Sequence, residues 1–167
     1  ALEPFYHEDP WSSALKDKRV LVISPFEKSI KKQYEKREDL WENKNILPEF
    51  ELLTLRTPMS AGISDPEFDT WFDGLEYFKE QIKDKAPEFV IVGAGAWSLP
   101  IVAYCSDLGI DALHMGGGTQ ILFGIKGKRW DDHDVISTFY NEEWVRPSGD
   151  EVPQRMNNMR IDTGHYW

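Results

Sequence analysis

The sequence predicts a three-layer, Rossmann-like α/β domain built on a mainly parallel sheet. Short β-branched apolar runs alternate along the chain with segments in which apolar residues recur at helical spacing. The strand-like runs are apolar on both faces, which is typical of parallel strands that helices cover on each side. Such an alternation implies right-handed crossovers between the strands. The chain has 167 residues, and we expect residues 1–167 to form a single domain.

The first half of the chain contains two predicted strands and two predicted helices. The first strand spans residues 19–24, and Pro25 ends it. A helix is expected over residues 26–41, where apolar side chains recur between Lys and Glu. The second strand spans residues 50–55, and the Asp-Pro-Glu stretch from position 65 is typical of a helix start. The inward face of that helix is expected to carry Phe68, Trp71, Phe72, Leu75, Phe78 and Ile82.

The second half continues the alternation and then loses it. A third strand is predicted at residues 89–92, followed by a helix over 97–108 that Gly109 ends. A short fourth strand over 111–115 leads to a short helix over 119–123. Beyond residue 126 we expect an irregular C-terminal tail that packs through its aromatic residues, which are Trp130, Trp144, Tyr166 and Trp167.

The composition excludes several classes of protein. A net charge of −10 argues against a nucleic-acid polymer as partner, because such a polymer requires a basic surface. No apolar run approaches the ~20 residues of a membrane span, so we expect no transmembrane segment. The single cysteine, Cys105, excludes an internal disulfide and a multi-cysteine metal site, and its apolar surroundings indicate a buried, inert thiol. These features favour a cytoplasmic protein.

Three turns are expected to meet at the carboxyl edge of the sheet, where open parallel sheets bind ligands. They begin at Ser24, at Gly93 and at His114, and the last two are rich in glycine. Small residues allow backbone N–H groups to approach an anion, and a helix N-terminus adds partial positive charge. Two glycine-rich turns on neighbouring strands favour a phosphate-bearing ligand over purely structural turns.

The turn at Gly93 has the form G-x-G-x-x-S, which invites comparison with dinucleotide-binding proteins. Two features argue against nicotinamide chemistry. The next strand ends in His114-Met115 rather than in an acid that holds a ribose, and the third small residue is Ser98 rather than Gly or Ala. The chain also has no G-x-x-x-x-G-K-[S/T] motif, so a P-loop is excluded.

A basic loop follows the second glycine turn directly. Lys126, Lys128 and Arg129 are placed to fold over phosphates, and Trp130 is placed to stack on a base or a sugar ring. The alternative is a solvated loop with one buried Trp. Arg146, further along the chain, is an additional candidate for a cation at this edge.

Two further features carry candidate chemistry. His114, at the end of a strand, is interpreted either as a base or ligand contact, or as a core histidine. The run Asp-Asp-His-Asp from residue 131 contains ligand types for a divalent cation, although such a run more often forms a solvated turn.

Several stretches resemble the C-terminal part of bacterial glycosyltransferases with the GT-D fold. They are Lys-Arg-Val-Leu-Val-Ile-Ser from residue 18, Glu-Phe-Val-Ile-Val-Gly-Ala-Gly-Ala-Trp-Ser from residue 88, and Leu-Gly-Ile-Asp-Ala-Leu-His-Met-Gly from residue 108. The run Gly-Gly-Thr-Gln-Ile-Leu-Phe-Gly-Ile-Lys-Gly-Lys-Arg-Trp-Asp from residue 117 resembles a branch linked to surface-polysaccharide synthesis.

The resemblance implies a domain that binds a nucleotide-sugar donor and transfers the sugar to a glycan acceptor, in polysaccharide or glycoconjugate synthesis. It also implies a divalent cation, Mn²⁺ or Mg²⁺, but the acidic motif that binds metal in the family lies in an upstream segment with no counterpart here. The chain also does not begin with Met. Three alternatives stay open: the chain is part of a longer protein, other acids such as Asp131 serve instead, or the domain binds nucleotides or sugar phosphates without catalysis.

The leading hypothesis places the donor diphosphate on the two glycine turns, with the basic loop neutralising the charge of the leaving group. The candidate catalytic residues are His114 and Asp131. No metal ligand is assigned. The candidate ligand-binding residues are Ser24, Gly93, Gly95, Trp97, Ser98, Gly116, Gly117, Gly118, Thr119, Gln120, Lys126, Lys128, Arg129, Trp130 and Arg146.

Overall fold

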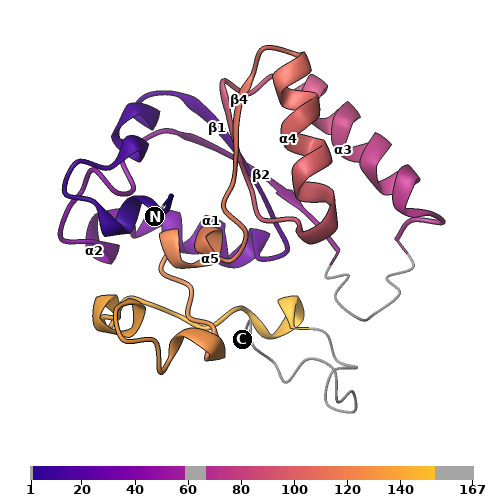
Figure 1. The fold of residues 1–167 in the computed structure, drawn as a ribbon. Coiled ribbons are helices and arrows are strands. Elements are labelled where there is room, and N and C mark those ends of the chain that lie inside the picture. The colour runs from indigo at the N-terminus through magenta and orange to yellow at the C-terminus, as the bar shows by residue number, and fades with distance from the viewer. Residues whose placement is uncertain (1, 59–66, 153–167) are drawn as a thin grey trace.

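The fold is a four-stranded, all-parallel sheet between two layers of helices (Figure 1). The computed structural model describes residues 2–58 and 67–152 of the chain. The strands are β1 (Arg19–Ser24), β2 (Glu51–Arg56), β3 (Phe89–Val92) and β4 (Asp111–His114). They lie in the order β2-β1-β3-β4, and each neighbouring pair is parallel. The predicted Rossmann-like α/β fold is therefore confirmed.

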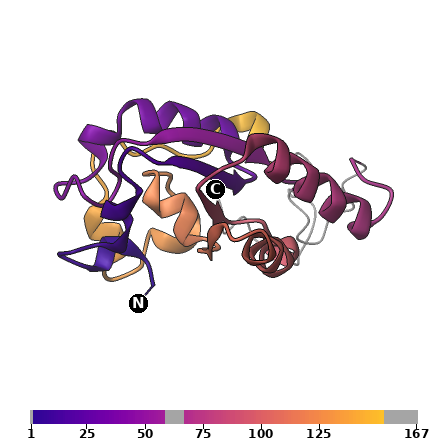
Figure 2. The ribbon, with the colours of Figure 1, turned by 90° about the horizontal axis from the view of Figure 1, so that it is seen from above.

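Helices cover both faces of the sheet, as Figures 1 and 2 show. The helices α3 (Trp71–Lys85) and α4 (Ser98–Asp107) pack together on one face. The helices α1 (Glu27–Glu35), α2 (Arg37–Leu40) and α5 (Gly118–Leu122) lie on the other face, together with the C-terminal part of the described chain.

Two hydrophobic cores, one on each face, hold these layers together. Alternate residues of β1 supply them: Val22 points into the core with α1 and α5, and Ile23 into the core with α3 and α4. Both side chains are at most 1% exposed. Because successive side chains of a strand point to opposite faces, a strand that is apolar throughout requires a cover on each side.

The helix starts differ from the sequence prediction in two places. The predicted start at position 65 lies outside the described residues, and α3 begins at Trp71 with Thr70 as its N-cap. Thr70 and Asp73 form a capping box, which is why the helix begins there. The predicted inward face is wrong for Trp71 and Phe72, which are 37% and 70% exposed. The helix predicted from residue 26 to 41 is interrupted after Glu35, where the C-cap Lys36 leaves helical geometry.

The turn after β3 also differs from the prediction in its detail. A 3₁₀ turn over Gly95–Trp97 precedes α4, so the helix begins at Ser98 rather than at Trp97. Gly109 follows α4 with φ of +70°, as expected for a residue that ends a helix in the left-handed region.

The C-terminal part of the described chain has little regular structure, and its aromatic residues pack as expected. Trp144 is 3% exposed and donates its indole N–H to the Leu40 carbonyl at 3.2 Å. Trp130 is partly buried against the same core, whereas Tyr166 and Trp167 lie outside the described residues. Across residues 2–58 and 67–152, no helix has the length and apolar character that crossing a membrane requires.

Candidate functional site

A cavity of about 480 Å³ opens at the carboxyl edge of the sheet. The strand order reverses between β1 and β3, and doubly wound sheets bind their ligands beside such a reversal. All three turns predicted to form the site contribute to the wall. The lining residues are Ser24, Pro25, Phe26, Thr57, Pro58, Gly93, Ala94, Gly95, Ala96, His114, Gly116, Gly117 and Gln120.

The turn after β1 forms an apolar side of the cavity. The Ser24 hydroxyl accepts a hydrogen bond from the Phe26 backbone N–H at 3.2 Å, and Ser24 is 2% exposed. Its side chain therefore holds the turn in shape. Pro25 and Phe26 are presented to the cavity beside it.

The turn after β3 depends on Gly93 for its close contact with the turn after β4. A Cβ at Gly93 would lie 2.9 Å from the Gly116 carbonyl oxygen and 3.0 Å from Thr119 Oγ1, so only glycine fits. Gly95 has φ of +55°, which also favours glycine. At Gly93 the close neighbour is therefore the turn after β4, whereas the sequence predicted an anion there.

The turn after β4 folds back onto the end of β3. The N–H groups of Met115 and Gly116 both donate to the Val92 carbonyl, at 3.0 and 3.3 Å. This places the exposed His114 on the cavity wall beside Gly116 and Gly117. Gln120 reaches the wall from α5 and donates from its amide to the Lys126 carbonyl at 3.1 Å.

One cation of the basic loop reaches the rim of the cavity. A Cβ at Gly117 would overlap the guanidinium of Arg129, and it would lie 3.3 Å from the Trp130 ring. The Arg129 guanidinium is itself stacked over Trp130, with Cζ 4.2 Å from the ring centroid. Arg129 and Trp130 thus cover Gly117, and Trp130 stacks on this guanidinium, whereas the sequence predicted that it stacks on a base or a sugar ring.

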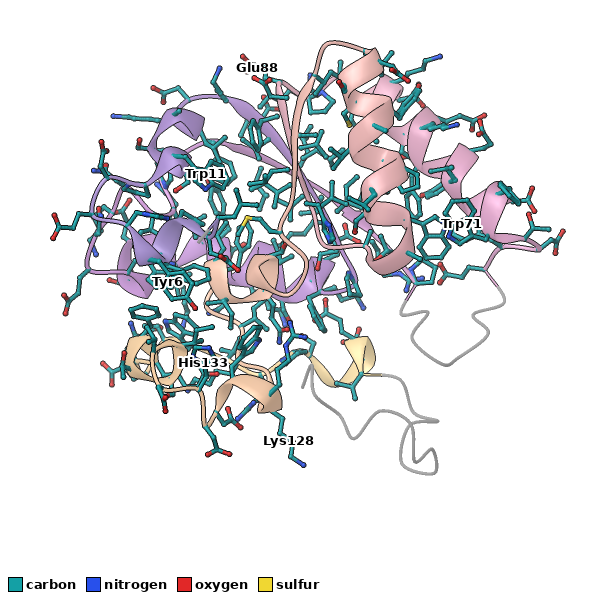
Figure 3. The ribbon with its side chains drawn as sticks, viewed as in Figure 1. Tyr6, Trp11, Trp71, Glu88, Lys128 and His133 are labelled. Atoms are coloured by element: carbon teal, nitrogen blue, oxygen red, sulfur yellow. The ribbon has the colours of Figure 1, made fainter. Side chains whose placement is uncertain are left out.

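The other two cations of the loop lie elsewhere. Lys126 Nζ lies over the ring of Tyr140, 5.2 Å from its centroid. Lys128 is exposed, and Figure 3 shows its side chain pointing away from the domain. The structure therefore separates three residues that the sequence treated as one group.

Four further candidates lie off the described cavity wall. The ring of Trp97 is 5% exposed in the core with α3, and its indole N–H donates to the Trp71 carbonyl at 3.0 Å. Ser98 is buried and accepts from the Ala94 N–H at 2.9 Å, so it closes its own turn. Thr119 is 1% exposed behind Gly93. The fourth candidate is Gly118, and the side chain of Glu3 lies against it.

Asp131 and Arg146 bind each other rather than the cavity. Two hydrogen bonds of 2.8 and 2.7 Å join the Arg146 guanidinium to both carboxylate oxygens of Asp131. Burial and the nearby Asp131 carboxylate raise the pKa of Tyr140 to about 12, so that this phenol stays neutral. The carboxylate proposed as a base or metal contact is therefore engaged by a guanidinium.

The side chains present do not fit the divalent cation that the family resemblance implies. The described residues contain no group of three or more His, Cys, Asp or Glu side chains arranged to hold a metal ion. Asp131 faces the positive charge of Arg146, which opposes cation binding. We therefore assign no metal role to these residues.

The sequence reading missed Thr57 and Pro58, which lie on the cavity wall directly after β2. Thr57 is 1% exposed, and its N–H donates to the Ser24 carbonyl at 3.3 Å. The available signal was their position at the end of a parallel strand, because all such ends meet at one edge. Comparison with known proteins yields no matching family model, no matching curated protein and no matching solved structure.

Proposed function

We propose that this chain is a nucleotide-sugar donor-binding domain that holds its ligand in the cavity at the carboxyl edge of the sheet. The observation that carries the proposal is the convergence of three strand-to-helix turns at the reversal between β1 and β3. The cavity volume of about 480 Å³ lies in the range of small-molecule and cofactor sites.

The two sides of the cavity suit the two ends of such a ligand. Backbone groups at Gly95, Ala96 and Gly117 can approach a diphosphate closely, and the Arg129 guanidinium at the rim supplies a charge-assisted donor. In the turn after β1, the partly exposed Pro25 offers apolar surface to a base or a sugar ring.

Transfer of the sugar to a glycan acceptor is the activity that we propose for this site. The acceptor oxygen would attack the anomeric carbon, the bond from that carbon to the diphosphate would break, and the diphosphate would leave with the electron pair. His114, the one titratable group on the described cavity wall, would take the proton of the acceptor hydroxyl, and Arg129 would stabilise the leaving charge.

One observation favours a second function, that of a binding module without catalysis. The described wall of the cavity contains no carboxylate, and Asp131, the acid that the sequence nominated, is paired with Arg146. A site that holds a phosphate through backbone groups and one arginine can bind a nucleotide or a sugar phosphate without reacting with it.

The binding proposal is tested by adding a charge at the cavity wall. Ala96 is exposed on this wall, and Ala103 is exposed further along α4 and away from the cavity. We expect Ala96→Glu to weaken UDP or GDP binding at least tenfold by repulsion, and Ala103→Glu to change it less than twofold. Isothermal titration calorimetry gives both values. Equal affinities for wild type and Ala96→Glu, or no binding to either protein, would contradict a ligand in this cavity.

Catalysis is tested separately by release of nucleoside diphosphate from UDP- or GDP-sugars. We expect His114→Gln to abolish release while the affinity for the nucleotide stays within about threefold of wild type. Binding without any release by the wild type would support the module. A thermal shift with NADH, but not with nucleoside diphosphates, would contradict both functions, since a ligand at 100-fold over its Kd adds about 2.7 kcal/mol of stability.

A further inference from the structure

A second cavity, of about 640 Å³, lies apart from the first and has a different lining. It forms where the N-terminal segment, the loop after α2 and the 3₁₀ turn Ile136–Phe139 (η5) come together. Figure 3 shows Tyr6 at this junction. The lining residues are Phe5, Tyr6, His7, Glu8, Leu40, Trp41, Glu42, Asn43, Ile46, Val135, Thr138, Phe139, Tyr140 and Asn141.

Aromatic rings form much of this wall, and they are inclined to one another. The rings of Tyr6 and Phe139 are 6.3 Å apart at 56°, and those of Trp41 and Phe139 are 5.6 Å apart at 63°. Tyr6 is 37% exposed, so its ring is accessible. Inclined ring faces that enclose a space are the arrangement with which proteins bind substituted ammonium groups, because each ring face carries partial negative charge.

The charged groups of the wall have one sign. Glu8 and Glu42 line the cavity, no lysine or arginine lines it, and neither carboxylate has a partner among the described residues. The amides are already engaged: Asn43 donates to the Glu8 carbonyl at 2.9 Å, and Asn141 donates to the Asp39 carbonyl at 3.1 Å. His7 also lines the wall, and the ring faces and the two carboxylates are the groups there that suit a cation.

One ring of the wall already holds a cation. Lys126 Nζ lies 5.2 Å from the centroid of Tyr140. Lys126 does not line the cavity, so its ammonium group contacts the ring of Tyr140 and leaves the cavity itself free. Tyr6 and Phe139 remain as the partly exposed rings for an incoming group.

We propose that this cavity binds a small organic cation, a substituted ammonium group, against the inclined ring faces of Tyr6 and Phe139, with Glu8 and Glu42 as counter-charges. A compact metal ion would leave the ring faces unused, and a neutral ligand would lack the charge that two carboxylates attract. The site does not depend on the function of the first cavity.

The test compares choline with 3,3-dimethylbutanol, which has nearly the same shape and no charge. We expect choline to shift the amide resonances of Tyr6, Glu42 and Phe139 in ¹H–¹⁵N spectra, with an affinity at least tenfold above that of the neutral probe. Equal affinities would show a merely apolar pocket and overturn the proposal. Absence of shifts at 100 mM choline, or stronger shifts from cellobiose, would overturn it as well.

Variants locate the interaction. Glu42→Gln changes one exposed side chain, and we expect at least a threefold loss of choline affinity; Tyr6→Leu keeps apolar bulk without a ring and should lose more. Glu80→Gln is the matched control, because Glu80 is exposed on α3 at the other face of the sheet. Equal effects of Glu42→Gln and Glu80→Gln would show that choline responds only to the net charge of the protein, and would contradict the site. Choline affinity unchanged by saturating UDP would confirm that the two cavities are independent.

Discussion

The turns after β1 and β3 have equivalent places in the fold, yet they differ in what occupies the start of the following helix. Both lead from a buried parallel strand into a helix, and neither N-cap residue, Phe26 or Trp97, makes a capping hydrogen bond through its side chain. At α1 a remote carboxylate does the capping. Glu151 accepts from the N–H groups of Lys28 and Ser29, at 2.7 and 3.2 Å, and from the Ser29 hydroxyl.

The turn after β3 keeps its surface open. Gly95 and Ala96 are exposed and line the cavity. The difference teaches that a strand-to-helix turn at the right edge of a sheet is available to a ligand only if the rest of the chain leaves it free. The first turn already holds an anion, the chain's own carboxylate, and the second faces the cavity.

The largest expected effect comes from removing the close contact of the open turn. Gly93→Ala places a methyl group 2.9 Å from a backbone carbonyl oxygen that cannot move aside cheaply. We expect a loss of about 1–3 kcal/mol in the free energy of unfolding, measured by urea denaturation. The control is Gly149→Ala, where a Cβ meets nothing within 4 Å and the change should stay within about 0.5 kcal/mol. Similar losses for both variants would contradict the contact.

The next effect comes from removing the anion that closes the first turn. Glu151→Gln loses a charge-assisted cap, and we expect about 1 kcal/mol less stability. We expect the affinity for UDP or GDP to change less than twofold, because Glu151 rather than a ligand occupies this helix start. Glu142→Gln, an exposed acid nearby in sequence, is the control. A fall in affinity that tracks Glu151→Gln would show that the start of α1 takes part in binding.

An effect on ligand affinity rather than on stability separates the cations near the turn after β4. Arg129→Ala should weaken UDP or GDP binding about tenfold, roughly 1.4 kcal/mol, because the guanidinium lies on Gly117 at the rim. Lys128→Ala should change the affinity less than twofold, since its side chain points into solvent (Figure 3). Calorimetric titration of both variants decides this, and equal losses would mean that only the general positive charge of the loop matters.

The smallest effect concerns an acid of the first turn. Burial alone would raise the pKa of Glu27, but hydrogen bonds from Lys31 and Thr54, at 2.6 and 2.7 Å, outweigh it and hold the pKa below its usual value. A lowered pKa contributes stability above the unfolded value, and that contribution is lost as the pH falls through the folded value. Glu27→Gln should cost about 0.5 kcal/mol at pH 7 and almost nothing at pH 3.

Urea denaturation at the two pH values checks this expectation. The control is Glu35→Gln, an exposed acid at the other end of α1, which should show no such difference. A loss at pH 3 equal to that at pH 7 would assign the effect of Glu27→Gln to packing.

The strands were predictable from sequence because their signal is local. The bounds of β1 and β3 agree with the prediction at both ends, since β-branched apolar runs buried on both faces have few other stable arrangements. The helix start at position 65 could not be compared, and the inward face assigned to Trp71 and Phe72 was wrong. Periodicity gives the phase of a helix but not the residue at which the core begins to cover it.

The candidate site was predictable in its backbone and less so in its side chains. Glycine turns at strand ends place Gly93, Gly95, Gly116 and Gly117 on one wall, as expected from strand direction alone. The positions of Trp97, Asp131 and Lys126 could not be predicted, because each depends on a neighbour elsewhere in the chain: Trp71, Arg146 and Tyr140.

The sequence by itself determined the alternation of strands and helices, the parallel sheet and the edge at which its turns meet, because these follow from short-range pattern and from strand direction. Only the tertiary structure decided which turn stays open. Glu151 closes the start of α1 from a position 122 residues away from Ser29, and Thr57 joins the cavity from the neighbouring strand. Contacts of that range depend on how the whole chain packs, and no local pattern of residues carries them.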